Sequence, residues 1–205
     1  ISEEAHKDGV KVLLSGDCAD EIFGGYSWYE YLNRISIDNI AQNYAGKDNM
    51  SFLNVEHSLA KRINSMNLQS SQQKALSLHY YATEPEKKFL YNKDFFNNPK
   101  KSIRFFYEFN NKSDWKEIDY IKNDKFFYLK NEMLHKLDRM TMANSIEGRV
   151  PFASKKLFNL SQGLNYEDLV KANKLKIILK KAFQKHIPNN IINRKKHGFN
   201  VPLDY

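Results

Sequence analysis

Residues 10–26 have the sequence VKVLLSGDCADEIFGGY, in which a short aliphatic run ends abruptly and is followed by acids and a Gly-Gly pair. The run at residues 10–14 is too short for a buried helix, and its β-branched and aliphatic side chains favour an interior parallel strand. Ser15-Gly16 allows the chain to turn sharply off that strand. Asp20 and Glu21 suit the first turn of a following helix, where the helix dipole favours anions.

The three acids after this turn lie where α/β proteins bind their ligands. In an open α/β sheet, ligands sit just beyond the carboxyl ends of the strands. Asp17, Asp20 and Glu21 crowded there would hold a divalent cation together with polyphosphate, or a positively charged substrate group. A strand-turn-helix corner with solvated acids explains the spacing equally well, because corners marked by glycine are common. Spacing alone leaves both interpretations open.

The composition of this 205-residue chain indicates one domain or the larger part of one. Hydrophobic residues make up 41%, enough for a core. No apolar run approaches the roughly 20 residues of a membrane helix. No signal-peptide pattern is visible and the one cysteine, Cys18, cannot form a disulfide framework, so we expect a cytoplasmic protein. Because the sequence starts with Ile1 rather than Met, residues are expected to be missing upstream.

The distribution of charge is more informative than the formal net charge of +8. Residues 169–203 contain no Asp or Glu. Their cationic side chains are Lys171, Lys174, Lys176, Lys180, Lys181, Lys185, Arg194, Lys195 and Lys196. Such a segment indicates either an anionic partner or a solvated basic face. An RNA-binding module would leave the acidic corner at residues 15–21 without a purpose, so we expect no nucleic-acid partner.

The rest of the chain is expected to be almost wholly helical. Apolar residues recur at helical spacing in residues 51–66 and 70–82, and the aromatic residues there are interpreted as core. Residues 115–147 predict a long helical stretch with a break, which Gly148 is placed to end. Its expected buried stripe consists of Leu129, Met133, Leu137 and Met140. Residues 10–14 form the single strand predicted, so its sheet partners are expected upstream or in another chain.

The amphipathic helix predicted at residues 174–186 carries a lysine suited to phosphate chemistry. Lys176 lies at the edge of the apolar stripe, so its stem can be buried while its ammonium reaches a cavity. A half-buried ammonium is a suitable point charge for phosphate oxygens that gain negative charge in a transition state. Lys174 and Lys180 are rival candidates for this role.

Four blocks of the sequence resemble signatures of the asparagine synthase family. SGDCADEIFGGY at residues 15–26 resembles S-G-(E/D)-G-x-D-E-(L/I)-F-G-G-Y. KLDRMTMANSIEGRVPF at residues 136–152 resembles V-D-R-x-(S/T)-M-x-x-S-x-E-x-R-x-P-F. KIILKKAF at residues 176–183 resembles K-x-x-L-(R/K)-x-A-(F/L), and RKKHGFNVPL at residues 194–203 resembles R-x-K-x-G-F-x-V-P-L. Four blocks in family order over nearly the whole chain are far more specific than any single Gly-rich motif.

This resemblance implies a fold, a reaction and its cofactors. The fold is α/β, the C-terminal and mostly helical part of an adenine nucleotide alpha hydrolase-like (ATP-pyrophosphatase) domain with one core parallel strand visible. The reaction is that of an ATP-dependent amide ligase. Aspartate is adenylated with release of pyrophosphate, and ammonia from glutamine displaces AMP to give asparagine. ATP and Mg²⁺ are the implied cofactors. The implied partners are small-molecule substrates, with no membrane, and a homodimer of the full-length protein stays an open alternative.

The resemblance also implies roles for particular residues. Ser15 and Gly16 match the family's pair that borders the nucleotide. Asp17 matches the acid tied to forming and using the acyl-adenylate. Asp20 matches a ligand of Mg²⁺-pyrophosphate, and Lys176 matches the lysine that stabilises the transferred phosphate.

Several departures from the family pattern bear on this interpretation. Cys18 stands where the family has Gly, Ala153-Ser154 replaces Leu-Asp, and Asn173 replaces the Gly of a Gly-Lys pair. Residues 1–205 are interpreted as a partial synthetase domain. They contain neither an S-G-G-x-D-S phosphate-binding loop nor an N-terminal cysteine glutaminase domain, so this part alone is expected to be inactive. The alternatives are a related amidotransferase for another carboxylate, such as a sugar uronic acid, and a non-catalytic fragment. The carboxylate, the ammonia source and the oligomeric state stay open.

Overall fold

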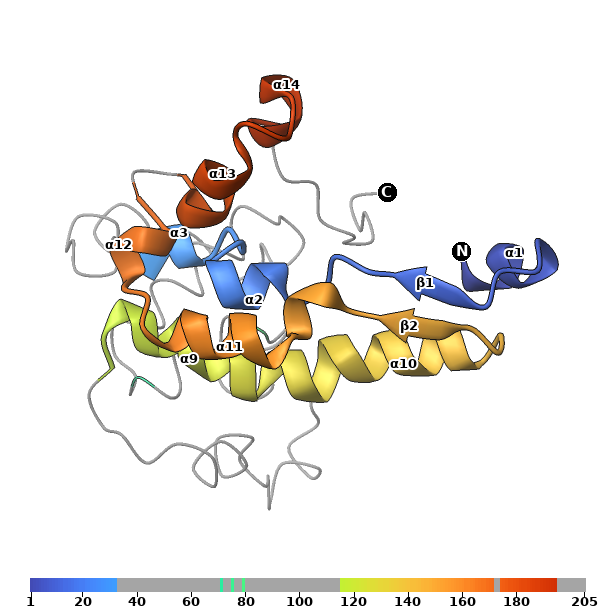
Figure 1. Ribbon diagram of the computed structural model, residues 1–205. Helices are drawn as coiled ribbons and strands as arrows, with labels where there is room; N and C mark the ends of the chain where they lie inside the picture. Colours follow the sequence, from blue (N-terminus) through green and yellow to red (C-terminus); the bar gives the residue numbers. More distant parts are fainter. Residues whose placement is uncertain (33–70, 72–74, 76–78, 80–114, 172–173, 195–205) are drawn as a thin grey trace, which may run out of the picture. The chain divides into compact units, whose positions relative to one another are not determined.

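The computed structural model describes residues 1–32, 71, 75, 79, 115–171 and 174–194 (Figure 1). The chain divides into two compact units. The first consists of Ile1–Tyr31 and Lys116–Ile192, and the second of Leu32–Trp115 and Asn193–Tyr205. Residues 51–66 and most of 70–82 lie outside the described residues, so the aromatic core expected there stays a prediction.

The described part of the chain is mostly helical with a two-stranded parallel sheet, as the predicted fold class requires. Up to residue 32 the elements are α1 (Ser2–Lys7), β1 (Val12–Leu14), α2 (Ala19–Phe23) and α3 (Tyr29–Leu32). From residue 117 they are α9 (Glu117–Phe126), the π-helical η2 (Leu129–Met133), α10 (Leu134–Met142), β2 (Glu147–Arg149), the 3-10 turn η3 (Pro151–Ala153), α11 (Lys155–Gln162), α12 (Tyr166–Leu169), α13 (Ile177–Phe183) and α14 (Asn189–Ile192). None of the described helices is long and apolar enough to cross a membrane.

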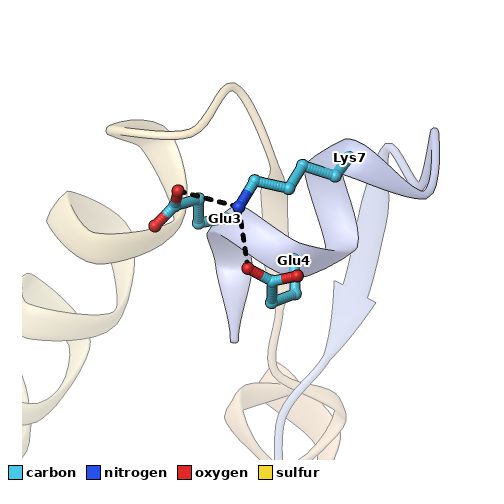
Figure 2. Close-up of polar contacts among 3 residues, drawn as sticks. All are labelled: Glu3, Glu4 and Lys7. Atoms are coloured by element: carbon cyan, nitrogen blue, oxygen red, sulfur yellow. Dashed lines mark hydrogen bonds and ion pairs between the residues drawn. The ribbon is translucent and has the colours of Figure 1, made fainter.

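The first helix, α1, begins with acidic residues, which the helix dipole favours in a first turn. Glu3 and Glu4 lie in its first turn, and Lys7 one turn later contacts both carboxylates, at 3.1 and 2.9 Å (Figure 2). These side chains are exposed, so the contacts support the helix locally and order little else. Gly9, with φ of +75°, follows the helix and leads the chain into β1.

The sheet joins two segments that are far apart in the sequence. β1 and β2 run parallel, with Leu13 opposite Gly148. The ladder is bracketed by bonds from Glu147 N to Lys11 O and from Ser15 N to Arg149 O, both 2.8 Å. One partner strand therefore lies within this chain, so the expectation that all partners lie upstream or in another chain is wrong. Glu-Gly-Arg carries no β-branched or aromatic residue, and tertiary pairing overrides its weak local preference.

Residues 10–14 were expected to form an interior strand, and among the described residues β1 has one neighbouring strand, β2. Leu14 is 74% exposed and Val12 is 36% exposed. β2 packs closely on α10: a Cβ placed on Gly148 of β2 would lie 3.1 Å from Oγ1 of Thr141 on α10. Figure 1 shows α10 running alongside β2.

The helical stretch expected at residues 115–147 is broken at η2, as predicted, but it ends earlier than Gly148. α10 stops at Met142, and Ser145 adopts a left-handed φ of +55° in the turn that follows. This early end lets Ile146 become fully buried, and its N–H donates to Thr141 O at 3.1 Å. The predicted stripe is buried at Leu129 but exposed at Met140, where α10 reaches solvent.

The core of the first unit forms where α2 meets α9 and the segment after α11. Ile22, Ile121 and Leu169 are completely buried. Gly24 takes a left-handed conformation with φ of +67°, and a Cβ there would lie 3.0 Å from Leu169 Cβ. A glycine is therefore required both by the backbone and by the close approach of the neighbouring chain.

Candidate active site

The site begins at the turn after β1. Ser15 Oγ donates a hydrogen bond to Asp17 Oδ2, and Asp17 N donates to Ser15 Oγ at 3.3 Å. A serine and an aspartate that bond each other across two residues stabilise a turn without using the strand ladder. The carboxylate of Asp17 is held by this turn. Gly16 has open space around the position of a Cβ, so packing does not demand a glycine there.

Cys18 links this turn to α2. It occupies the N-cap position with a φ of +71°, a left-handed conformation that L-residues rarely adopt. Its side chain is 1% exposed. Burial is the main reason that the pKa of the Cys18 thiol is raised to about 12, and the charges of Glu21 and Asp17 add to the effect. A buried thiol with such a pKa is a poor nucleophile, so we assign Cys18 no chemical role.

Asp20 and Glu21 lie in the first turn of α2, as the sequence predicts, but they face different surroundings. Asp20 is partly exposed, whereas Glu21 is 1% exposed. Neighbouring residues on a helix point about 100° apart, so one acid faces the site and the other the core. Of the three acids, Glu21 is therefore excluded from direct contact with a solvated ligand.

Lys176 reaches the acid that faces the site. Its Nζ lies 2.9 Å from Asp20 Oδ1, and the two side chains are 25% and 27% exposed. The structure therefore brings together the two charged residues that sequence analysis placed at the phosphate end of the site. Lys174, one of the rival candidates, is exposed, and its backbone forms a reciprocal pair of bonds with Lys171.

The local structure at Lys176 differs from the expected helix. α13 begins at Ile177, and Lys176 is its N-cap, with φ of +55°. The N–H of Lys176 donates to Gly24 O at 3.3 Å, which ties the start of α13 to the end of α2. This hydrogen bond favours a left-handed conformation at Lys176 over an extension of α13 by one residue. In that conformation the side chain of Lys176 points toward Asp20.

Gly25 forms the floor under the Asp20–Lys176 pair. A Cβ on Gly25 would lie 1.9 Å from Asp20 Oδ1 and 2.1 Å from Lys176 Cε. Any larger residue would therefore displace the ion pair. The Gly-Gly pair is visible in the sequence but this function was not predicted, and the spacing of Asp20 and Gly25 is the signal that could have indicated it.

Glu21 and Tyr26, which directly follow Asp20 and Gly25 in the sequence, form a buried hydrogen bond. Tyr26 Oη donates to Glu21 Oε1 at 2.5 Å. Burial raises the pKa of Glu21, and the hydrogen bond from Tyr26 opposes that rise. The pKa of Tyr26 is raised as well, mainly by burial and then by the nearby charge of Glu21. Glu21 is one of the three acids predicted at this corner, and no role was predicted for Tyr26.

A second buried acid lies in the same cluster. Tyr29 Oη donates to Asp124 Oδ2 at 2.6 Å, and Tyr166 Oη donates to Tyr29 O at 2.6 Å. Asp124 is 2% exposed. These bonds connect α3, α9 and α12. The sequence contains no local signal for them, because each depends on segments that are far apart along the chain.

The sequence itself identifies the family to which this arrangement belongs. The sequence model of the asparagine synthase family matches residues 1–205. The chain belongs to the asparagine synthase family. It is 32% identical over 213 residues to glutamine-hydrolysing asparagine synthetase 1 of Bacillus subtilis (strain 168), and this match covers 99% of this chain and 32% of that protein. It is 31% identical over 200 residues to glutamine-hydrolysing asparagine synthetase 3 of the same organism, and this match covers 96% of this chain and 27% of that protein.

This asparagine synthase-family chain spans about a third of the length of these relatives. No solved structure gives a significant match to it. The family consists of carbon-nitrogen ligases that generally use ATP, and its domain belongs to the adenine nucleotide alpha hydrolase-like superfamily. The predicted family is thereby confirmed, and so is the fold class at the level of that superfamily.

Membership of the asparagine synthase family raises the question of whether this site suits Mg²⁺. In the described part of the chain, no group of three His, Cys, Asp or Glu side chains could hold a metal ion alone. Mg²⁺ with nucleotides needs less, because one or two carboxylates suffice and phosphate oxygens and waters complete its shell. Asp20 supplies such a carboxylate, is partly exposed, and stands beside a cation that suits phosphate. The residues present therefore fit Mg²⁺ bound together with a polyphosphate.

Proposed function

We propose that this chain forms part of an ATP-dependent amide ligase. The observation that carries the proposal is the 2.9 Å contact between Asp20 and Lys176, which joins the first signature block to the third. A partly buried ammonium beside a carboxylate is suited to binding phosphate oxygens and their metal ion. Gly25 leaves room for this ion pair, because a Cβ there would lie 1.9 Å from Asp20 Oδ1.

In the proposed reaction, a substrate carboxylate oxygen attacks the α-phosphorus of ATP, and pyrophosphate leaves. Ammonia then attacks the acyl carbon, the C–O bond to AMP breaks, and the nitrogen loses a proton as the amide forms. The first step places growing negative charge on the transferred phosphate and on the leaving pyrophosphate. Fixed cationic groups that meet this charge contribute most to the rate of such steps.

Each predicted site residue has a place in this proposal. Lys176 binds the phosphate oxygens that gain charge. Asp20 orients that ammonium and supplies an oxygen ligand to Mg²⁺, which when bound screens phosphate charge. Asp17 serves the acyl-adenylate, and Ser15 with Gly16 borders the nucleotide. These last three assignments rest on the resemblance to the family signature.

We assign aspartate as the carboxylate substrate, asparagine as the product and glutamine as the source of ammonia. The names of the relatives, glutamine-hydrolysing asparagine synthetases, support this assignment. The alternative, a sugar uronic acid, rests on two departures from the family pattern, Asp17 in place of Glu and Ser154 in place of Asp. Ser154 is the N-cap of α11, and its Oγ accepts from Leu157 N at 3.4 Å. Because Ser and Asp are equally good N-caps, this departure has a structural explanation that needs no change of substrate.

A test uses the exchange of labelled pyrophosphate into ATP by the full-length protein, with Mg²⁺ and either aspartate or glucuronate. We expect aspartate to trigger exchange, and we expect K176A to lower the rate roughly 100-fold or more, as is usual when a preorganised charge is removed. K181A is the control, because it removes an exposed lysine of α13 that no role was predicted for, and it should retain exchange.

The outcomes separate the parts of the proposal. Exchange with glucuronate alone would replace the assigned substrate. Equal rates for K176A and K181A would remove Lys176 from the site, and an absence of exchange with either carboxylate would refute the ligase assignment.

A further inference from the structure

The segment between α2 and α3 is anchored at Tyr26, directly after the glycine under the ion pair. Tyr26 is buried, and its ring stacks on Trp28 with centroids 4.1 Å apart. It also meets Tyr29 and Tyr128 edge-on, at 5.8 and 5.7 Å. Contacts on three sides leave this ring little freedom to move. The packing of the Tyr26 ring therefore restricts the position of the backbone next to it.

One hydrogen bond connects Tyr26 to the helix that carries the site carboxylate. Tyr26 Oη donates to Glu21 Oε1 at 2.5 Å, and Glu21 directly follows Asp20 on α2. Because adjacent helical residues keep a set angle to each other, holding Glu21 inward also sets the direction of Asp20 outward. A rotation of α2 would break this buried bond, which is costly when no water can replace the partner.

The backbone between the two residues touches the ion pair itself. Gly25 N donates to Asp20 O at 2.8 Å, and Gly24 O accepts from Lys176 N at 3.3 Å. The position of a Cβ on Gly25 falls within 2.1 Å of both Asp20 Oδ1 and Lys176 Cε. A small displacement of this segment would therefore alter the contact between the two charged side chains.

We propose that Glu21 and Tyr26 are a positioning pair that sets the Asp20–Lys176 contact and thereby the affinity of the site for pyrophosphate. This inference rests on the proposed function, since pyrophosphate is the product that the site would release. Glu21 and Tyr26 touch no substrate. They act through the direction of α2 and through the backbone at Gly25.

The experiment compares Y26F with Y29F in the full-length protein. Each change removes one buried tyrosine hydroxyl from the same aromatic cluster, but the hydroxyl of Tyr29 bonds Asp124 rather than Glu21. Thermal unfolding shows whether the two variants are equally folded. We expect Y26F to raise the apparent KM for pyrophosphate in the exchange reaction about fivefold, the usual effect of one lost hydrogen bond, and to change the maximal rate less. Y29F should stay within about twofold of the parent in both quantities.

A second pair of variants tests the acceptor side of the bond. E21Q keeps a carbonyl oxygen that can accept from Tyr26, whereas E21L has similar size and no acceptor. We expect E21L to behave like Y26F and E21Q to remain closer to the parent. A general loss of packing would instead affect Y29F and Y26F alike, and that result would overturn the proposal.

Direct binding of Mg²⁺-pyrophosphate, measured by calorimetry, separates this inference from the proposed function. If the parent protein binds pyrophosphate and Y26F weakens it, the positioning pair stands even when no carboxylate triggers exchange. If Y26F binds pyrophosphate as the parent does, the positioning pair is refuted whatever the exchange assay shows. A parent protein that binds no pyrophosphate would overturn both.

Discussion

At the scale of single residues, Lys125 shows how a lysine is kept inside this fold. Its side chain is 3% exposed, and its ammonium donates to Ser161 O at 3.3 Å and to Ser161 Oγ at 3.0 Å. Ser161 lies near the carboxyl end of α11, where the helix dipole favours a cation. Burial, followed by repulsion from Lys122, still lowers the pKa of Lys125 from 10.5 to about 8.

The lowered pKa predicts that stability depends on pH through Lys125. Between about pH 8 and 10.5 the unfolded chain binds a proton that the folded chain has released, so the free energy of unfolding rises with pH over this interval. We expect a gain of about 2 kcal/mol between pH 7 and pH 9.5 from this residue. Urea unfolding of the parent and of K125M at both pH values measures it. The difference between the two proteins isolates Lys125 from other groups, and parallel pH dependences would contradict the prediction.

At the scale of secondary-structure elements, some helices and strands have a local sequence signal that predicts them and others have none. α2 was predictable because its acids follow a strand and a Ser-Gly turn. β2 was not, because Glu-Gly-Arg becomes a strand only through pairing with β1 and packing on α10. The end of α10 was misplaced for the same reason, since the burial of Ile146 rather than Gly148 decides where the helix stops.

The packing of β2 on α10 yields a prediction at this scale. A Cβ on Gly148 would lie 3.1 Å from Thr141 Oγ1 and 3.3 Å from Thr141 Cγ2, which is tight. We expect G148A to lower the free energy of unfolding by about 1–2 kcal/mol, because close packing leaves little room to adjust. In a T141A background the same change should cost clearly less. Denaturant unfolding of the four proteins in this double-mutant cycle gives the coupling, and additive effects would show that the two elements do not press on each other.

At the scale of the whole molecule, the site was predictable to the extent that it lies in local motifs. Asp20 in the first turn of α2 and a partly buried Lys176 followed from patterns and from the family resemblance. The hydrogen bonds of Glu21 and Asp124 did not, because buried tyrosines from other segments supply them. The left-handed backbone of Lys176 was also unpredictable, since it depends on a bond to Gly24. Long-range contacts, rather than residue types, account for what the sequence left open.

The charge of the whole chain leads to the last prediction. A formal net charge of +8, with a C-terminal segment free of acids, suits polyanions in general. If that segment serves nucleotide phosphates rather than RNA, binding to RNA should be only non-specific. We expect dissociation constants no tighter than about 10⁻⁶ M at physiological salt and a steep loss of affinity as salt rises. Fluorescence anisotropy of a labelled 20-nucleotide RNA, measured over a KCl series with two unrelated sequences, tests this. Tight binding that distinguishes the two sequences would contradict it and favour a nucleic-acid partner.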